Sequence, residues 1–218
     1  MLLLTSTPAW AQPSPAATRP AREGRVEVSG GMRFNGATDL GNIPATETAT
    51  GGRTRTIFDS DNALDGAIGL DARLGVLLTR AFQIEGAVSL TPTHLSSRLT
   101  NDTDGAASVT AETPVMQWLI EGGVLARLGR WRPGLMPFLT AGAGYLRHVH
   151  DGRTLIESGR SYYVGAGADY IWKATGRGAV KGAGLRADIR AGLLQDGALL
   201  DDELHLSPVA SVGLFVMF

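Results

Sequence analysis

Hydrophobic and polar residues alternate with a period of two along most of the chain. Within residues 25–34, the apolar side chains Val26, Val28, Met32 and Phe34 fall on one face, and polar residues occupy the other. Because successive side chains of a β-strand point to opposite sides, this pattern predicts a half-apolar strand. The alternation recurs in residues 64–76, 82–91, 116–128, 136–148, 161–172, 185–193 and 210–218. The sequence therefore predicts eight strands.

The segments between these strands have the composition of loops and turns. Residues 36–63 are polar and predict one long loop, while Asn101–Gly105 and Gly129–Gly134 predict turns. Residues 195–205 form an acidic loop, and Lys173–Gly184 is a polar, glycine-rich connection. Apart from this last connection, long and short links alternate, which is the habit of outer-membrane barrels. The expected fold is an all-β, eight-stranded, antiparallel up-and-down barrel, with both chain ends on the periplasmic side.

The polar face of the predicted strands carries full charges in mid-strand. Such residues could coat a water-exposed sheet, or they could pair inside a narrow barrel. The apolar face recurs in every strand with almost no charge, which favours a closed barrel with lipid outside. An eight-stranded barrel is filled by its own side chains, and unpaired buried charge is costly. We therefore expect a lumen plugged by paired charges from this set: Glu27, Arg33, Asp65, Asp71, Arg73, Glu85, Glu121, Arg127, Arg147, Asp169, Arg186, Asp188 and Arg190.

Aromatic residues gather near the ends of the predicted strands. Trp and Tyr concentrate where a membrane meets water, so this placement predicts two girdles, although aromatic residues could equally fill a core. The periplasmic girdle would contain Phe82, Trp131, Trp172 and Phe218, and the outer girdle would contain Phe34 and Tyr162.

Composition removes several classes of function. Cysteine is absent, which excludes disulfides, thiolate zinc sites and a cysteine nucleophile. The net charge of −1 gives no support to nucleic-acid binding, and no apolar run is long enough for a membrane helix. Glycine, with 29 residues, has about twice its usual share, which fits tight turns and closely packed curved sheets.

The N-terminal segment differs from the rest. Residues 1–11 are apolar and end in Ala9-Trp10-Ala11, which is similar to the cleavage site of a secretory signal peptide; a frayed apolar terminus is the alternative. Residues 12–24 are rich in proline and alanine and predict a flexible segment. The barrel is then expected over residues 25–218.

The last strand has the most specific pattern. Val212-Gly213-Leu214-Phe215-Val216-Met217-Phe218 alternates and ends in an aromatic residue, and Pro137–Tyr145 and Leu185–Arg190 show related patterns. With these segments, residues 25–218 resemble the small OmpA-, OmpX- and OmpW-like outer-membrane barrels. The resemblance implies the outer membrane of a Gram-negative bacterium. It also implies that Val212, Leu214, Val216 and Phe218 form the signal read by the barrel-assembly machinery.

Candidate catalytic and ligand-binding residues are few. His148 and His150 could offer metal ligands on one strand face, and Ser158 or Ser161 near His148 could serve acyl transfer. No nucleophile motif accompanies them, and exposed polar residues at a strand rim explain them better. Gly142-Ala143-Gly144 and Gly165-Ala166-Gly167 lack the context of phosphate loops and are expected to relieve crowding where strands bend. The acidic run Asp201–Glu203 is expected to be a solvated loop. We expect neither a cofactor nor an enzyme.

Three functions remain open from the sequence. The first is a structural or surface-interaction barrel embedded in the lipid of the outer membrane. The second is a transport barrel for small solutes, which an apolar interior would favour. The third is a soluble, lipocalin-like calyx, which requires an apolar inside and a polar outside. The loops at residues 36–63 and 195–205 are expected to hold specificity.

Overall fold

The computed structural model describes residues 25–48, 51–100, 107–150, 156–174, 178–196 and 204–218. Within these residues it contains ten β-strands. Among the same residues, no helix is long and apolar enough to cross a membrane. The strands are β1 (Val26–Asn35), β2 (Thr38–Thr48), β3 (Thr54–Leu64), β4 (Ala67–Leu77), β5 (Phe82–Thr100), β6 (Val109–Arg127), β7 (Leu135–His150), β8 (Ile156–Ala174), β9 (Gly182–Asp196) and β10 (His205–Met217).

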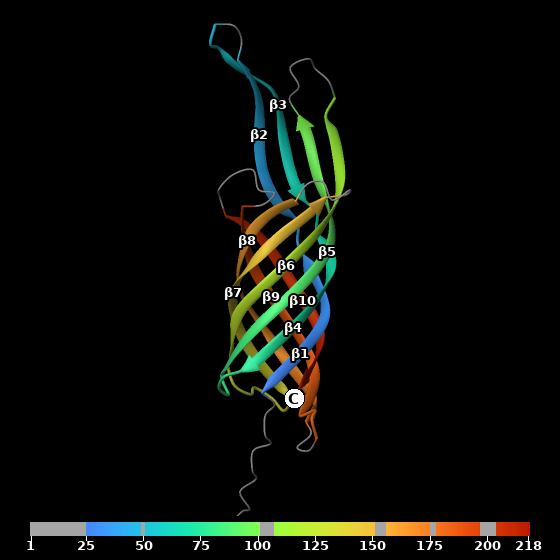
Figure 1. The fold of residues 1–218 in the computed structure, drawn as a ribbon, viewed down its shortest axis with the longest axis vertical. Helices are drawn as coiled ribbons and strands as arrows, with labels where there is room; N and C mark the ends of the chain where they lie inside the picture. The colour runs from blue at the N-terminus through green and yellow to red at the C-terminus, as the bar shows by residue number, and fades with distance from the viewer. Residues whose placement is uncertain (1–24, 49–50, 101–106, 151–155, 175–177, 197–203) are drawn as a thin grey trace, which may run out of the picture.

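Eight of the ten strands form a closed antiparallel barrel. The hydrogen-bonded order is β5-β4-β1-β10-β9-β8-β7-β6, and β6 pairs back with β5 to complete the ring. The first and last strands are neighbours, because Val28 pairs with Val216 and Phe34 pairs with Ala210. The strands wind obliquely around the barrel, and the C-terminus lies at its lower end (Figure 1). The predicted fold class is therefore confirmed.

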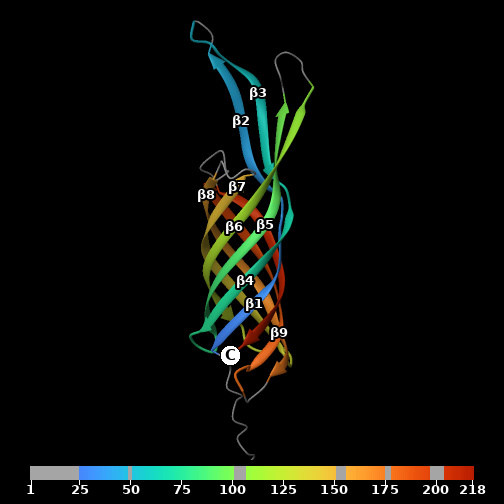
Figure 2. The ribbon, with the colours of Figure 1, turned by 45° about the vertical axis from the view of Figure 1, so that its right-hand side comes forward.

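Residues 36–63 do not form the long loop that the sequence predicted. They contain β2 and most of β3, which pair with each other and continue beyond the rim of the barrel (Figure 2). β3 also pairs with β5, from Asp59 opposite Thr100 to Leu64 opposite Leu95. The outer parts of β5 and β6 stay paired as far as Leu99 opposite Val109. We call this four-stranded extension the projecting sheet: β2, β3, residues 95–100 of β5 and residues 109–114 of β6.

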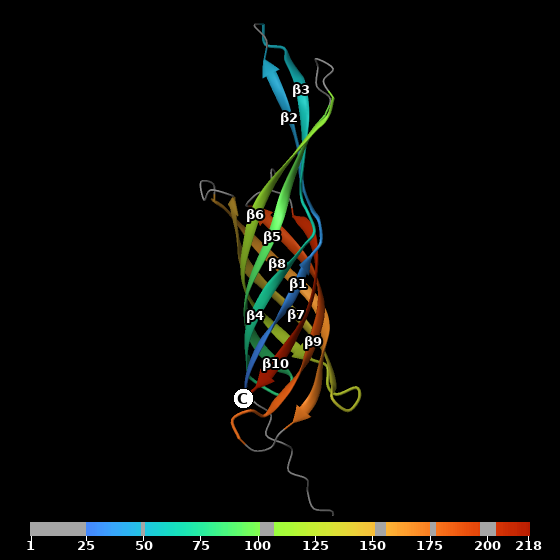
Figure 3. The ribbon, with the colours of Figure 1, turned by 90° about the vertical axis from the view of Figure 1, so that its right-hand side faces the viewer.

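The projecting sheet was missed because its composition does not alternate strongly. Water reaches much of its surface, so polar residues are tolerated on both faces, and cross-strand contacts hold the strands together. Asn42 Nδ2 donates to Asp61 Oδ1 at 2.6 Å between β2 and β3, and Ser97 Oγ donates to Asn62 Oδ1 at 2.6 Å between β5 and β3. Figure 3 shows the sheet standing above the barrel, at the end opposite the C-terminus.

The connections follow the expected division between the two ends of the barrel. At the end that holds Val26 and Phe218, short links join β4 to β5, β6 to β7 and β8 to β9, including the glycine-rich link after Ala174. The opposite end carries the projecting sheet and the links from β7 to β8 and from β9 to β10. Residues 1–24, 101–105 and 201–203 lie outside the described residues.

Apolar side chains cover the outside of the barrel, and polar side chains fill the middle of its interior. Leu70, Ile189 and Val164 are more than 60% exposed, whereas Asp169 and Gln83 are fully buried. We call the outward apolar residues of the eight barrel strands the apolar belt. A soluble calyx requires the opposite arrangement, so the structure contradicts that alternative.

Glycines on the inner face make room for large side chains from neighbouring strands. A Cβ atom at Gly167 would overlap the ring of Phe138, and one at Gly142 would overlap Tyr163. A Cβ atom at Gly184 would likewise overlap the ring of Phe215. The glycine-alanine-glycine segments thus relieve crowding, as expected, but the crowding comes from side chains in the lumen.

Candidate functional site: the charged lumen and the outer surface

The middle of the lumen is built around two arginines that share one aspartate. Asp188 on β9 accepts from Arg73 at 2.7 Å and from Arg190 at 2.7 Å. Ser211 Oγ lies 2.7 Å from the same carboxylate and 2.6 Å from Arg73 Nη2. Asp71 binds the Nε atom of Arg73 from the same strand. Because these partners come from β4, β9 and β10, the contacts tie distant strands across the lumen.

The network continues towards the projecting sheet through Glu121. Glu121 on β6 accepts from Arg33 at 2.7 Å and lies 3.4 Å from Arg190. Arg33 Nε donates to Asn35 Oδ1, and Asn35 Nδ2 donates to Thr91 Oγ1 at 3.1 Å. The guanidinium of Arg190 also lies 4.5 Å from the ring centroid of Tyr163.

The network continues towards the termini through Arg186. This side chain binds three carboxylates, at 2.6 Å for Glu27, 2.5 Å for Glu85 and 2.8 Å for Asp169. Arg127 approaches Glu27 at 3.1 Å and donates to Gln83 Oε1 at 2.9 Å. Eleven of the thirteen charged residues in the predicted set, five arginines and six carboxylates, therefore lie inside the barrel. Each of the six carboxylates lies within ion-pair distance of a guanidinium.

Apolar layers lie beyond the charges at both ends. Towards the termini, the buried rings of Phe138 and Phe215 flank Arg186, with ring centroids 5.1 and 5.9 Å from its guanidinium carbon. Towards the projecting sheet, Leu119, Leu146 and Leu194 form a buried cluster. The alternating pattern did not predict these layers, because alternation predicts one purely polar face for each strand. An apolar residue at a polar-face position near a strand end, such as Phe138 or Leu146, is the signal that could have revealed them.

Two residues of the predicted charge set are not in the lumen. Arg147 on β7 points outward and is exposed, as is its neighbour Tyr145, so the face assigned to this strand was wrong. The inward positions are instead Leu146 and His148, which are buried. Asp65 lies at the exposed corner between β3 and β4, where its Oδ1 atom accepts from Ser96 Oγ at 3.2 Å.

The six predicted girdle aromatics all have exposed rings, from 38% for Tyr162 to 81% for Trp131. Phe34 is next to the last residue of β1 and Phe82 is the first of β5, while Trp131 lies in the link between β6 and β7. Their role at the membrane interface stays a prediction. The structure adds three outward aromatics to this set: Trp118, Tyr145 and Tyr170.

The assembly-signal residues belong to the closing strand. Val212 and Leu214 are exposed on the outer face of β10, Val216 is half-buried, and Phe218 follows the strand and is exposed. The backbone of Phe218 joins the first and last strands, since its N–H donates to Val26 O at 2.8 Å.

The candidate catalytic residues do not form a catalytic arrangement. His148 is buried on the inner side of the wall, whereas Ser158 is exposed on the outer side, where its Oγ lies 2.6 Å from Tyr145 Oη. Ser161 is buried opposite Gly144, four positions along β7 from His148. Among the described residues, no three His, Cys, Asp or Glu side chains are grouped to hold a metal ion. Asp201–Glu203 lie outside the described residues, and so does the side chain of His150.

Solved structures with the same architecture are found among small outer-membrane proteins. Neisserial surface protein A is 12% identical, with a TM-score of 0.56, and the match covers 88% of this chain and 97% of that one. The outer membrane protein OprG from Pseudomonas aeruginosa is 11% identical, with a TM-score of 0.53, and the match covers 90% and 96% of the two chains. At these identities the likeness is one of fold. No protein-family model and no curated protein sequence matches the chain.

The outer surface and the closure of the sheet indicate that the barrel is surrounded by lipid. A closed barrel leaves no unpaired sheet edge to lipid, and an outward band of large apolar residues is stable only in contact with hydrocarbon. Both features are present, and membrane barrels of this kind reside in bacterial outer membranes. The chain is an integral outer-membrane protein with the fold of the small eight-stranded β-barrels.

Proposed function

We propose that this barrel is closed to solutes and serves a structural or surface-interaction role, with the projecting sheet presented outside the membrane. The observation that carries the proposal is the ion-pair network across the lumen. Arg186, Arg73 and Arg190 each bind carboxylates from more than one strand. Opening a path through them would separate buried charges from their partners, which costs about 3–5 kcal/mol per broken pair.

The apolar layers support the same conclusion. A hydrated ion that passed the charges would still meet Phe138 and Phe215 at one end and the cluster around Leu119 at the other. Crossing such a layer requires shedding water without replacement by polar groups, which is strongly unfavourable. The alternative of a small-solute transport barrel was linked to an apolar, unpaired interior, and the central lumen is instead charged and paired.

Conductance tests this proposal directly. The purified barrel, reconstituted into planar lipid bilayers, should give no stable conductance steps, while a known porin in the same bilayer serves as the positive control. Retention of the folded form is checked by gel mobility with and without boiling in detergent. Stable, uniform conductance from the folded protein would overturn the closed-lumen proposal.

The extent of the projecting sheet supports a role at the cell surface. Its strands lie at the end opposite the short links, and residues such as Arg55, Glu47 and Arg98 are exposed on it. Loops and extensions carried by a rigid scaffold are the usual location of binding residues. We therefore place the interaction role on this sheet rather than in the lumen.

We also propose that the chain is not an enzyme. Ser158 and His148 lie on opposite sides of the barrel wall, and Ser161 lies opposite Gly144, four positions along β7 from His148. Four positions along a strand span about 13 Å. A nucleophile and its base must be within hydrogen-bond reach, and neither serine meets this condition. Folded protein in phospholipid vesicles should release no fatty acid above background. Release that disappears in Ser158→Ala or in Ser161→Ala would overturn this statement.

We further propose that β10 carries the signal for the barrel-assembly machinery. Phe218→Ser should reduce the amount of folded protein in the outer membrane of an expressing bacterium, because the assembly signal is weakened. The same variant should still refold in detergent, since the Phe218 ring is exposed. Equal amounts of wild type and variant in the membrane would contradict this assignment.

A further inference from the structure

Two charged residues lie on the outer wall of the barrel. On the eight barrel strands below the projecting sheet, and among the side chains that the structure describes, Arg147 and Arg160 are the charged ones that point outward. A charge on the lipid-facing side of a barrel costs about 2–4 kcal/mol at the membrane midplane and little near the interface. Both arginines lie towards the end that carries the projecting sheet, so they belong to the outer leaflet.

The two arginines are neighbours on adjacent strands. Arg147 on β7 is paired with Ser158 on β8, and Arg160 is paired with Tyr145, two residues from Arg147. Side chains in this diagonal relation lie roughly 7–8 Å apart. Among the side chains that the structure describes, no carboxylate forms an ion pair with either guanidinium. Two guanidinium groups at this spacing can bind one phosphate group or two adjacent ones.

Aromatic residues surround the arginine pair. Trp118 on β6 lies directly opposite Arg147, and Tyr145 lies directly opposite Arg160. Both aromatic side chains are exposed, and Tyr162 follows two residues after Arg160 on the same face. Tyrosine and tryptophan prefer the depth of the lipid headgroups, so these residues place the arginines at that depth.

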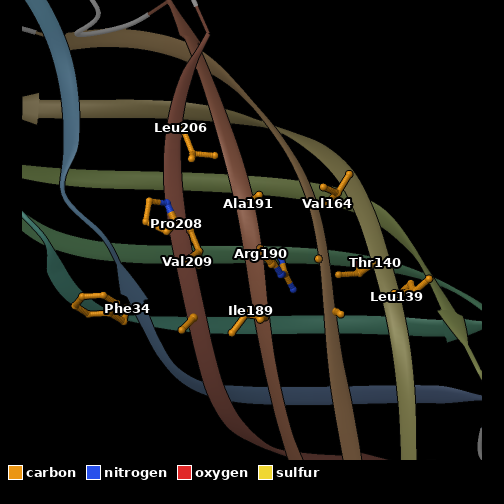
Figure 4. A pocket seen from close by; sticks show the side chains of 13 residues that line it. Phe34, Leu139, Thr140, Val164, Ile189, Arg190, Ala191, Leu206, Pro208 and Val209 are labelled. Atoms are coloured by element: carbon orange, nitrogen blue, oxygen red, sulfur yellow. The ribbon is translucent and has the colours of Figure 1, made fainter.

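An apolar groove lies on the same side of the wall, from β7, which carries Arg147, across β8 and β9 to β10 and β1. Its volume is about 880 Å³, and Figure 4 shows its lining. Small residues, including Ala166 and Ala191, leave space between larger neighbours such as Ile189, Leu206 and Phe34. Val164 belongs to this lining and lies on the same face of β8 as Arg160, four residues further along the strand. The groove thus begins about 13 Å along β8 from Arg160, beyond Tyr162.

We propose that Arg147, Arg160 and this groove form a binding site for a phosphorylated lipid of the outer leaflet. The guanidinium groups bind the phosphate, Trp118 and Tyr145 contact the headgroup region, and an acyl chain occupies the groove. The proposal rests on the location of the barrel in the outer membrane. Charge complementarity selects a phosphorylated headgroup, and the adjoining apolar groove selects a lipid over free phosphate.

The test measures retention of lipid A by the full-length, detergent-folded protein with native mass spectrometry. Arg147→Ser combined with Arg160→Ser should weaken retention at least about tenfold, since each charge-assisted hydrogen bond contributes on the scale of a tenfold change. Arg98→Ser is the matched control, because Arg98 is an exposed arginine on the projecting sheet. It should bind lipid A as the wild type does. Dephosphorylated lipid A should bind the wild type as weakly as lipid A binds the double variant.

A second variant tests the groove. Ala191→Phe fills the space between Ile189 and Leu206 and should also weaken retention of lipid A. Inorganic phosphate at millimolar concentration should not displace the lipid from the wild type. Equal retention by wild type and the double arginine variant, or displacement by inorganic phosphate alone, would overturn the lipid site.

Gel mobility without boiling distinguishes a failure of the lipid site from a failure of the membrane location. A wild-type protein that folds as a barrel but does not retain lipid A would contradict the lipid site alone. A protein that is soluble and monomeric without detergent would contradict the membrane location on which the site rests.

Discussion

The guanidinium of Arg186 lies 5.1 Å from the ring centroid of Phe138 while it binds three carboxylates on its other sides. This one side chain therefore joins the charged part of the lumen to the apolar layer near the termini. Because Glu27, Glu85 and Asp169 come from β1, β5 and β8, it also connects strands that are not neighbours in the barrel.

Replacing Arg186 should strongly destabilise the barrel. Arg186→Leu leaves three buried carboxylates with less compensation, and removing one partner of a buried pair costs about 3–5 kcal/mol. The free energy of unfolding, measured by urea titration in lipid vesicles, should fall by this amount. Arg55→Leu is the control, because Arg55 and its partner Glu47 are both exposed and such pairs contribute little. Similar losses in the two variants would contradict the role of the network.

Position 75 should tolerate only glycine, because the side chain of Gln83 occupies the space that a Cβ atom would need. A Cβ atom at this position would overlap the amide group of Gln83, which is fully buried and accepts from Arg127. Gly75→Ala should therefore destabilise the barrel by about 1–3 kcal/mol, the usual cost of overpacking.

A double-mutant cycle checks this explanation. In the background of Gln83→Ala, the further change Gly75→Ala should cost much less, because the overlapping side chain is gone. Gly122→Ala is the matched control on the outer face, where a Cβ atom would meet nothing within 4 Å. A cost of Gly75→Ala that is unchanged by Gln83→Ala would refute the contact.

The apolar belt should reject charge where it contacts lipid. Leu74 is 54% exposed on β4 and lies opposite Val28 of β1. Leu74→Arg should lower the free energy of unfolding in vesicles by about 2–4 kcal/mol. Val109→Arg, on the projecting sheet, should have little effect because this residue is in water. A tolerated arginine at position 74 would argue against lipid contact there.

The projecting sheet should be separable from the barrel. Replacing residues 41–62 by a two-residue Asn-Gly turn removes most of β2 and β3 but keeps the buried side chains of Leu40 and Leu64. Because the eight barrel strands keep their pairings, the shortened protein should still show a mobility shift on boiling. It should lose binding to any surface partner that the full chain captures. Loss of the mobility shift would show that the sheet is required for closure.

The period-two pattern was sufficient to predict the barrel, because each wall strand has to place apolar residues in lipid and polar residues in the lumen. The pattern failed at residues whose surroundings differ from those of the rest of their strand face. Phe138 is apolar but points inward, since the lumen near the termini is closed by rings, and Arg147 is charged but points outward near the end that carries the projecting sheet. Alternation alone does not encode position along the barrel axis, on which both residues depend.

Partners within the lumen could not be predicted from the sequence either. The charged set was recognisable, but which arginine meets which acid depends on how far each strand is shifted against the next. Arg33 and Glu121, for example, lie 88 residues apart in sequence and belong to strands that are not paired. The polar strands β2 and β3 were missed for a related reason, because water on both faces leaves no apolar stripe to detect.

The pairing of β1 with β10 makes the backbone a ring in which Arg25 N–H donates to Phe218 O at 2.8 Å. A ring of strands can be cut elsewhere without losing a wall contact. A circular permutant that links residues 25 and 218 and opens the chain in the turn at Thr79–Arg80 would keep all eight pairings. In such a permutant β10 would run directly into β1, so the proposed assembly signal would lie between two strands. Spontaneous refolding in detergent and assisted insertion in cells would then become two separately measurable properties of the same barrel.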